Sequence, residues 1–324
     1  MNNDLKLATN LVPFSRVCDR FVPGGYNEGY DFRKKLEMAG AIAGIKAVAL
    51  GWPSQFQDGA AIKKMLDDMG LKLGLVEPDI YGDPCFKNGS ISNPDPKIRR
   101  LAIERIKGTI DAALQAGSPD MNLWLGQDGF DYYFQGHYPD VWNWIVESLQ
   151  EVADYNDKIT ICLEYKCKEP RAHQYVANAG TALLLVQKIN KPHVGITVDV
   201  GHALNALEDP ACSAALAARE GRLRMIHLND NHRDWDHDLV PGAVNVWDHV
   251  ELFYWVRKLG FSGWYSIDVF PYREDGSEAL KRTVEVCRKC CMMADRLMEM
   301  NMEDLLRNGR HLEALRLLWD MVGN

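Results

Sequence analysis

The sequence lacks three features that define large classes of proteins. Its 324 residues contain no uninterrupted apolar run of about 18 residues, the length that a membrane-spanning helix needs. The N-terminal MNNDLKLATN has no basic head followed by an apolar stretch, which is the pattern of a secretion signal. Lys and Arg (37) are fewer than Asp and Glu (45), and a net charge of −8 repels the phosphates of nucleic acids. We therefore expect a cytoplasmic protein that binds neither a membrane nor a nucleic acid.

Cysteines are present, but they lack the pairing that a zinc site requires. A structural zinc site takes four ligands, usually as two pairs, and the one cluster here has no second pair. That cluster is CRKCC, with Cys287, Cys290 and Cys291. A chain of this length buries a large core without disulfides. We expect the eight cysteines to be small apolar fillers, with CRKCC on one face of a helix.

Eight short apolar runs alternate with longer amphipathic stretches. Several of these runs are apolar throughout, which is typical of parallel strands covered on both faces. A doubly wound sheet would carry a GxGxxG loop after its first strand, and none occurs. Eight strand–helix units are the number that closes a (β/α)₈ TIM barrel, so this α/β fold is predicted. The strands are expected at 5–12, 46–50, 72–77, 121–126, 158–164, 193–199, 222–228 and 263–268.

Helices are predicted between these strands and beyond the last one. Gly40, Gly70 and Gly117 each follow an amphipathic stretch, as glycine does at helix ends. The barrel is expected to span 1–275, followed by a C-terminal helical extension over 276–324. This extension packs either on the barrel or on a partner subunit of a homo-oligomer, a dimer or tetramer. Its helices are expected at 277–300 and 302–321, after barrel helices at 28–40, 58–70, 93–117, 140–155, 175–190, 209–220 and 245–260.

A carboxylate or an imidazole stands at the end of each of the last four predicted strands. These residues are Glu164, Asp199, His227 and Asp268. Barrel enzymes carry their chemistry at this end of the strands. Three carboxylates meeting there would repel one another unless a cation lay between them. Oxygen and nitrogen ligands without a thiolate suit Mn²⁺, Mg²⁺ or Co²⁺, with Zn²⁺ possible, so one or two divalent ions are predicted.

A second group of polar residues follows the same strands. His202, Asp236 and Asp238 could hold a second ion, or the two aspartates could belong to an acidic, solvated loop. Lys166 comes two residues after Glu164. Its ammonium would either polarise a substrate oxygen or form a salt bridge with Glu169.

Four segments in this order resemble the xylose isomerase-like barrel superfamily, which also holds rhamnose isomerase, the ketose 3-epimerases and endonuclease IV. They are LEYKCKEPR, TVDVGHA, HLNDNHRDWDHDLVPG and SIDVFPYRED. The resemblance implies a first metal bound by the four strand-end residues. It also implies a second, catalytic metal near His202, Asp236 and Asp238, with the choice among these aspartates and Asp234 open.

The resemblance implies an aldose–ketose isomerase that acts on a small sugar by a metal-assisted hydride shift. The alternatives are a ketose 3-epimerase using Glu164 and Asp268, a metal-dependent lyase or dehydratase, and a non-catalytic sugar-binding subunit. Asp268 stands where the familiar epimerases bring the longer Glu, which favours the isomerase. The expected catalytic residues are Glu164, Lys166, His202, Asp236 and Asp268, and the expected substrate-binding residues are Trp52, Trp124, Phe134 and Arg233, with Phe56 as a further aromatic candidate.

Overall fold

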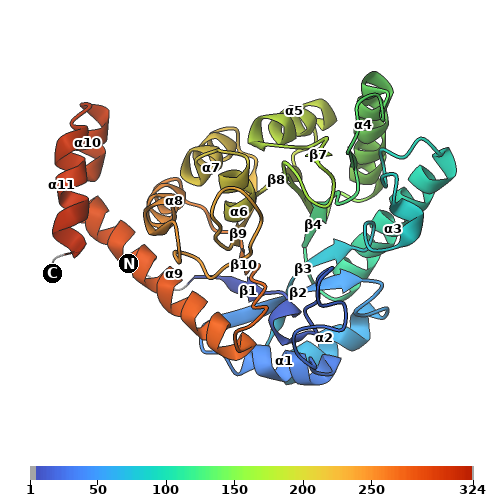
Figure 1. The fold of residues 1–324 in the computed structure, drawn as a ribbon, viewed down its shortest axis with the longest axis horizontal. Helices are drawn as coiled ribbons and strands as arrows, with labels where there is room; N and C mark the ends of the chain where they lie inside the picture. Colours follow the sequence, from blue (N-terminus) through green and yellow to red (C-terminus); the bar gives the residue numbers. More distant parts are fainter. Residues whose placement is uncertain (1–4, 323–324) are drawn as a thin grey trace.

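Eight parallel strands close into a barrel in the computed structural model, which describes residues 5–322 (Figure 1). Around the barrel the order is β1, β10, β9, β8, β6, β4, β3, β2 and back to β1. The predicted TIM barrel is confirmed, and each of the eight expected strands is present with small shifts of its ends. The strands are β1 (Leu7–Thr9), β2 (Ile45–Trp52), β3 (Lys72–Pro78), β4 (Asp120–Trp124), β6 (Thr160–Glu164), β8 (Val194–Asp199), β9 (Leu223–Leu228) and β10 (Tyr265–Ile267).

Helices cover the outside of the barrel (Figure 1). Aspartate side chains accept backbone N–H groups at the start of several of them, which explains where these helices begin. Asp95 is one example, followed by Pro96 at the first helical position. The helices are α1 (Phe32–Gly40), α2 (Gly59–Asp68), α3 (Pro96–Gln115), α4 (Tyr138–Tyr155), α5 (Ala179–Ile189), α6 (Val200–Asn205), α7 (Pro210–Arg219), α8 (Val246–Lys258) and α9 (Gly276–Glu299), with short 3₁₀ turns η1 (Val12–Phe14) and η2 (Pro84–Phe86).

Three local elements differ from the sequence prediction. Helix α6 begins directly after β8, because the Asp199 side chain accepts the His202 N–H at 2.7 Å and caps it. Strands β5 (Gly129–Phe130) and β7 (His173–Gln174) pair antiparallel between the loops after β4 and β6, and two residues are too few to leave a sequence pattern. The helix expected at 302–321 is divided into α10 (Met302–Arg307) and α11 (His311–Val322) near Gly309, whose φ is +65°.

The C-terminal helices occupy two positions. Helix α9 follows the eighth strand and packs beside α8 and η1, so it lies in the ring of helices around the barrel. Helices α10 and α11 project from the end of α9, away from the barrel axis (Figure 1). Within residues 5–322 no helix is both long enough and apolar enough to cross a membrane.

Apolar side chains around Trp264 fill the barrel interior towards the amino ends of the strands. Small residues make room for this indole: a Cβ added at Gly74 would lie 3.0 Å from Ala47 Cβ and 3.6 Å from Trp264 Cδ2. Ala8 and Leu75 belong to the same buried cluster. The buried polar side chains described below lie towards the carboxyl ends of the strands and in the segments that follow them.

Candidate metal centre

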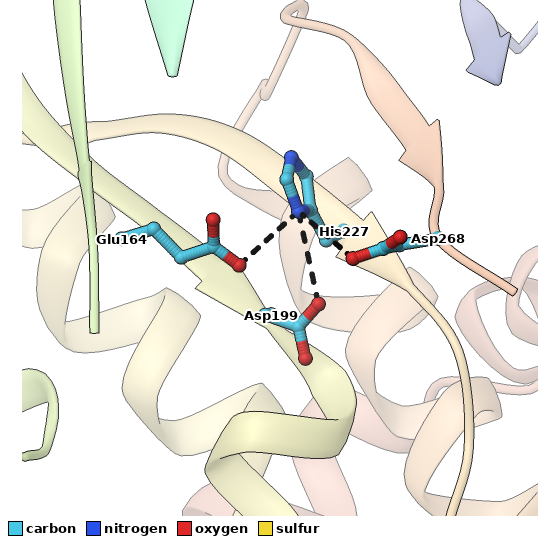
Figure 2. A group of neighbouring side chains, drawn as sticks. All are labelled: Glu164, Asp199, His227 and Asp268. Atoms are coloured by element: carbon cyan, nitrogen blue, oxygen red, sulfur yellow. Dashed lines mark ion pairs between the residues drawn. The ribbon is translucent and has the colours of Figure 1, made fainter. Parts of the chain in front are cut away.

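Glu164, Asp199, His227 and Asp268 meet at the carboxyl end of the barrel (Figure 2). One ligand atom from each lies within 4.8 Å of the others. His227 Nδ1 is 3.3 Å from Glu164 Oε1, 3.7 Å from Asp199 Oδ2 and 3.9 Å from Asp268 Oδ2. The register of the parallel strands explains this convergence, since Asp199 is paired with His227, and Asp268 follows the pair Ile267–Leu228.

An asparagine amide holds each of the three carboxylates. Sequence reading did not single out these asparagines, although each stands in or directly after a strand, where a buried amide is a signal. The Asn122 amide is itself oriented by Thr197 Oγ1, which donates to Asn122 Oδ1 at 2.7 Å. The three contacts are Asn122 Nδ2 to Glu164 Oε2 at 2.7 Å, Asn229 Nδ2 to Asp199 Oδ2 at 3.0 Å and Asn10 Nδ2 to Asp268 Oδ1 at 2.5 Å.

Burial and mutual charge shift the pKa values of this group in opposite directions. Burial, with the charges of Asp199 and Glu164, outweighs the attraction of His227 and raises the pKa of Asp268 to about 7. Burial alone would lower the pKa of His227, but the surrounding carboxylates raise it to about 10. Burial opposes the ionisation of Glu164, yet His227 and His202 bring its pKa well below the usual range.

The donor set fits a divalent cation. Both ring nitrogens of His227 are buried without a hydrogen-bond partner, and its neighbours are three carboxylates. Such orphaned nitrogens are costly unless something binds them. Three oxygen donors and one imidazole could hold Mn²⁺, Mg²⁺, Co²⁺ or Zn²⁺.

The second predicted group forms a hydrogen-bonded cluster beside the first. Lys166 Nζ is 2.7 Å from Glu169 Oε2 and 2.8 Å from Asp236 Oδ2, so the salt bridge to Glu169 forms and the ammonium also reaches the cavity. His202 Nε2 lies 3.1 Å from the same Asp236 oxygen. The Asp236 side chain is only 2% exposed, which is unlike a solvated loop residue. Burial opposes the charge of Asp236, but His202 and Lys166 lower its pKa.

Asp238 and Asp234, the other aspartates of this loop, lie in different surroundings. Asp238 Oδ1 accepts from Asn229 Nδ2 at 3.1 Å and the residue lines the cavity, whereas the Asp234 side chain is 77% exposed. Across residues 5–322, the four-residue centre is the only group of donors gathered tightly enough to hold an ion. The second metal site stays a prediction.

A cavity of about 570 Å³ opens over the centre, a size that suits a small ligand. Glu164, Lys166 and Asp268 line it. One wall is aromatic: the Trp124 ring lies 5.2 Å from Lys166 Nζ, and its centroid is 4.8 Å from that of Tyr81.

A family model described as "xylose isomerase-like TIM barrel" matches residues 39–290. The chain belongs to this family. It is 28% identical over 262 residues to a xylose isomerase of Thermus thermophilus, covering 78% of this chain and 68% of that protein. It is 31% identical over 194 residues to a xylose isomerase of Cereibacter sphaeroides, covering 56% of this chain and 45% of that protein. The chain thus spans between about half and two thirds of the length of these relatives.

Two of the solved structures with the same fold are of ketose 3-epimerases. A structure of L-ribulose 3-epimerase superposes with a TM-score of 0.73 at 15% identity, covering 91% of this chain and 97% of the other. D-psicose 3-epimerase with D-tagatose from Clostridium cellulolyticum H10 has a TM-score of 0.67 at 18% identity, covering 90% and 99%. At these low sequence identities, the similarity to the two structures supports the fold alone.

Several residues expected at the substrate site of this xylose isomerase-like barrel lie elsewhere. Trp52 packs on α3, where a Cβ added at Gly108 would lie 2.4 Å from its Cη2. Phe134 is fully exposed, and Phe56 is buried in the hydrophobic core. Because side chains alternate along a strand, closeness to a strand end does not decide whether a residue faces the barrel interior. Of the four expected aromatic residues, only Trp124 lines the cavity.

The candidate substrate arginine is not among the residues that line the cavity. Arg233 Nη2 forms an ion pair with Asp248 Oδ1 at 2.7 Å, and the Arg233 side chain is 40% exposed. Asp248 belongs to α8, which covers the outside of the barrel. The role of Arg233 in substrate binding stays a prediction.

The sequence reading overlooked polar residues contributed by β3. Glu77 and Asp79 line the cavity, and Asn122 Nδ2 donates to Glu77 Oε1 at 3.1 Å as well as to Glu164. Burial raises the pKa of Glu77. The signal was available, because Glu77 follows the apolar run of strand β3 just as Glu164 follows that of β6.

Proposed function

We propose that this chain is a divalent-metal-dependent sugar isomerase that interconverts an aldose and its ketose by a hydride shift. The observation that carries the proposal is the group of four donors, three of them buried, beside a cavity large enough for a small sugar. The xylose isomerases among its sequence relatives support the reaction class.

A bound divalent ion would polarise the sugar oxygens at this centre. The Lys166 ammonium, whose pKa is raised by Asp236 and Glu169 against the effect of burial, would steady the negative charge that develops on a substrate oxygen. Asp236 Oδ2 would position Lys166 and His202 rather than take a proton, because its lowered pKa makes it a weak base. Trp124 and Tyr81 would exclude water from one side of the sugar.

Incubation with a panel of aldoses and ketoses in D₂O tests this proposal. The Mn²⁺-loaded protein is expected to yield the partner aldose or ketose without carbon-bound deuterium, and treatment with EDTA should abolish turnover. Asp236→Asn should lower kcat by about two orders of magnitude or more. Asp234→Asn is the matched control on the same loop, since that side chain points to solvent. A product that carries one deuterium would overturn the hydride shift.

A ketose 3-epimerase is the second candidate, because β6 and β10 bring Glu164 and Asp268 to the same cavity. An epimerase would use them as acid and base on opposite faces of one carbon. Here both carboxylates gather around His227 Nδ1, and Asn10 also holds Asp268, which supports a role as ligands. In the D₂O experiment the epimerase would give a ketose with one deuterium at the inverted carbon. Loss of water would indicate a dehydratase, and no product across the panel would favour a lyase on larger glycosides or a non-catalytic subunit.

A further inference from the structure

The cavity wall contributed by β3 carries a carboxylate that the proposed reaction does not use. Glu77 stands on β3, which lies across the barrel from β9, the strand of His227. One Asn122 nitrogen donates to both Glu77 Oε1 and Glu164 Oε2. A sugar bound at the metal centre would therefore have a neighbouring part of its chain against Glu77.

One oxygen of Glu77 is free to bind a ligand. Oε1 accepts from Asn122, and no hydrogen bond or ion pair within residues 5–322 involves Oε2. Glu77 also lines the cavity. An ionised carboxylate oxygen only accepts hydrogen bonds, so the hydroxyl groups of a sugar are suitable donors.

Asp79, the neighbouring acid on the same wall, differs in this respect. Asp79 Oδ2 accepts the Ser54 backbone N–H at 2.7 Å and so holds the loop after β2. A Cβ at Gly51 would lie 3.0 Å from Asp79 Oδ1, so the glycine leaves room for this contact. Asp79 thus serves as a structural comparison for Glu77.

The charge of the cavity limits which ligands it accepts. Seven carboxyl groups line it, and its single lysine is already paired with Glu169 and Asp236. The other basic residues of the lining are His202 and His227, which lie among these carboxyl groups. A phosphate or carboxylate on the sugar, away from the metal centre, would meet carboxyl groups and no free lysine or arginine among the residues that line the cavity.

We propose that Glu77 is a specificity-determining residue that accepts hydroxyl groups of a neutral sugar and excludes sugar phosphates and sugar acids. This inference rests on the proposed function for the placing of the sugar over the metal centre. It goes further in naming the substrate class, which is an unphosphorylated, uncharged sugar chain.

Binding of unreactive open-chain analogues to the Mn²⁺-loaded protein tests the inference without turnover. Isothermal titration calorimetry would compare xylitol and sorbitol with sorbitol 6-phosphate and gluconate. The wild type is expected to bind the neutral alditols at least about tenfold more tightly than the anions. Glu77→Gln should weaken alditol binding about tenfold, whereas Asp79→Asn should change it less than about twofold. Glu77→Lys should gain affinity for sorbitol 6-phosphate.

Each outcome decides between the two proposals. Equal alditol affinity in the wild type and Glu77→Gln, with both holding Mn²⁺, would overturn the role of Glu77 and leave the isomerase untouched. Alditol binding that depends on Glu77, without turnover of any sugar, would overturn the isomerase proposal and support the role of Glu77. Absence of alditol binding by the Mn²⁺-loaded wild type, or tighter binding of the anions, would overturn the inference. Retention of Mn²⁺ by Glu77→Gln would show that the variant is folded.

Discussion

Protons would compete with a cation for the donors of the candidate metal centre. Asp268, with a pKa of about 7, and His227, with a pKa of about 10, hold protons near neutral pH that a metal ion must displace. The raised pKa of Asp268 also means that the folded carboxyl keeps a proton that the unfolded chain loses above about pH 4. In the metal-free protein Asp268 therefore lowers stability progressively as pH rises from about 4 to 7.

The affinity for Mn²⁺ is expected to rise from about pH 6 to pH 8, because binding displaces protons from Asp268 and His227. Calorimetric titrations in buffers of different ionisation enthalpy would show the release of protons. Asp268→Asn should flatten this dependence and weaken binding. Proton uptake on binding, or an affinity that falls with pH, would contradict the prediction.

The Asn122 amide should control metal affinity although it is not a ligand. Asn122→Ala frees Glu164 Oε2, so the carboxylate loses its fixed direction, and the apparent Kd for Mn²⁺ is expected to rise about 10–100-fold. Thr197→Val is a graded control, because it removes only the hydroxyl that orients Asn122. A larger effect of Thr197→Val than of Asn122→Ala would reject this arrangement.

At the scale of elements, each strand turns one set of side chains inward and the other towards the helices. Trp52 at the end of β2 belongs to the second set and packs on α3, where Gly108 leaves space for its ring. The expectation that Trp52 faces the sugar assumed that every side chain near the end of a strand points into the barrel. Successive side chains of a strand point to opposite faces, so neighbouring residues at a strand end alternate between the cavity and the surrounding helices.

Gly108→Ala is expected to destabilise the protein by about 1–3 kcal/mol, although alanine favours helices, because the added Cβ would lie 2.4 Å from Trp52 Cη2. Gly180→Ala on α5 is the matched control. Its nearest neighbour would be Asn178 Oδ1 at 3.5 Å, so a gain of up to about 1 kcal/mol is expected. Urea unfolding of both variants measures the difference, and equal stability would show that α3 shifts to accept the methyl group.

At the scale of the whole molecule, the projecting C-terminal helices expose apolar side chains. On α11, Leu312 is 72% exposed and Trp319 is 62% exposed. Helix α11 packs mainly on α10, and α10 in turn contacts the end of α9. Large exposed apolar side chains close together are typical of a surface that pairs with another subunit.

The homo-oligomer, a dimer or tetramer, stays a prediction that sedimentation can test. The 36.7 kDa chain is expected to sediment as an oligomer, and the double variant Leu312→Glu with Trp319→Glu should shift it towards the monomer. Leu184→Glu, at a leucine of α5 that is 46% exposed, is a control expected to leave the assembly unchanged. A wild type that sediments as a monomer would contradict the prediction.

The order of apolar runs along the chain determines the barrel. Each run forms a strand that must pair with a neighbouring strand, and eight such strands close the sheet into a barrel. The strand-end position of Glu164, Asp199, His227 and Asp268 is likewise visible in one dimension, since parallel strands all bring their carboxyl ends to one rim. Helix starts such as Asp95-Pro96 depend on local hydrogen bonds and could be predicted for that reason.

Contacts between distant residues were decided only by the tertiary structure. Asn10 meets Asp268 across 258 positions, and Asn122 lies between Glu77 and Glu164 because their strands are neighbours in the barrel. Whether a side chain faces the cavity depends on the tilt and register of its strand, which are set by how all eight strands close together. Local sequence contains no record of that closure, so it brought out the four strand-end donors but did not separate Trp124, which lines the cavity, from Trp52, which packs on α3.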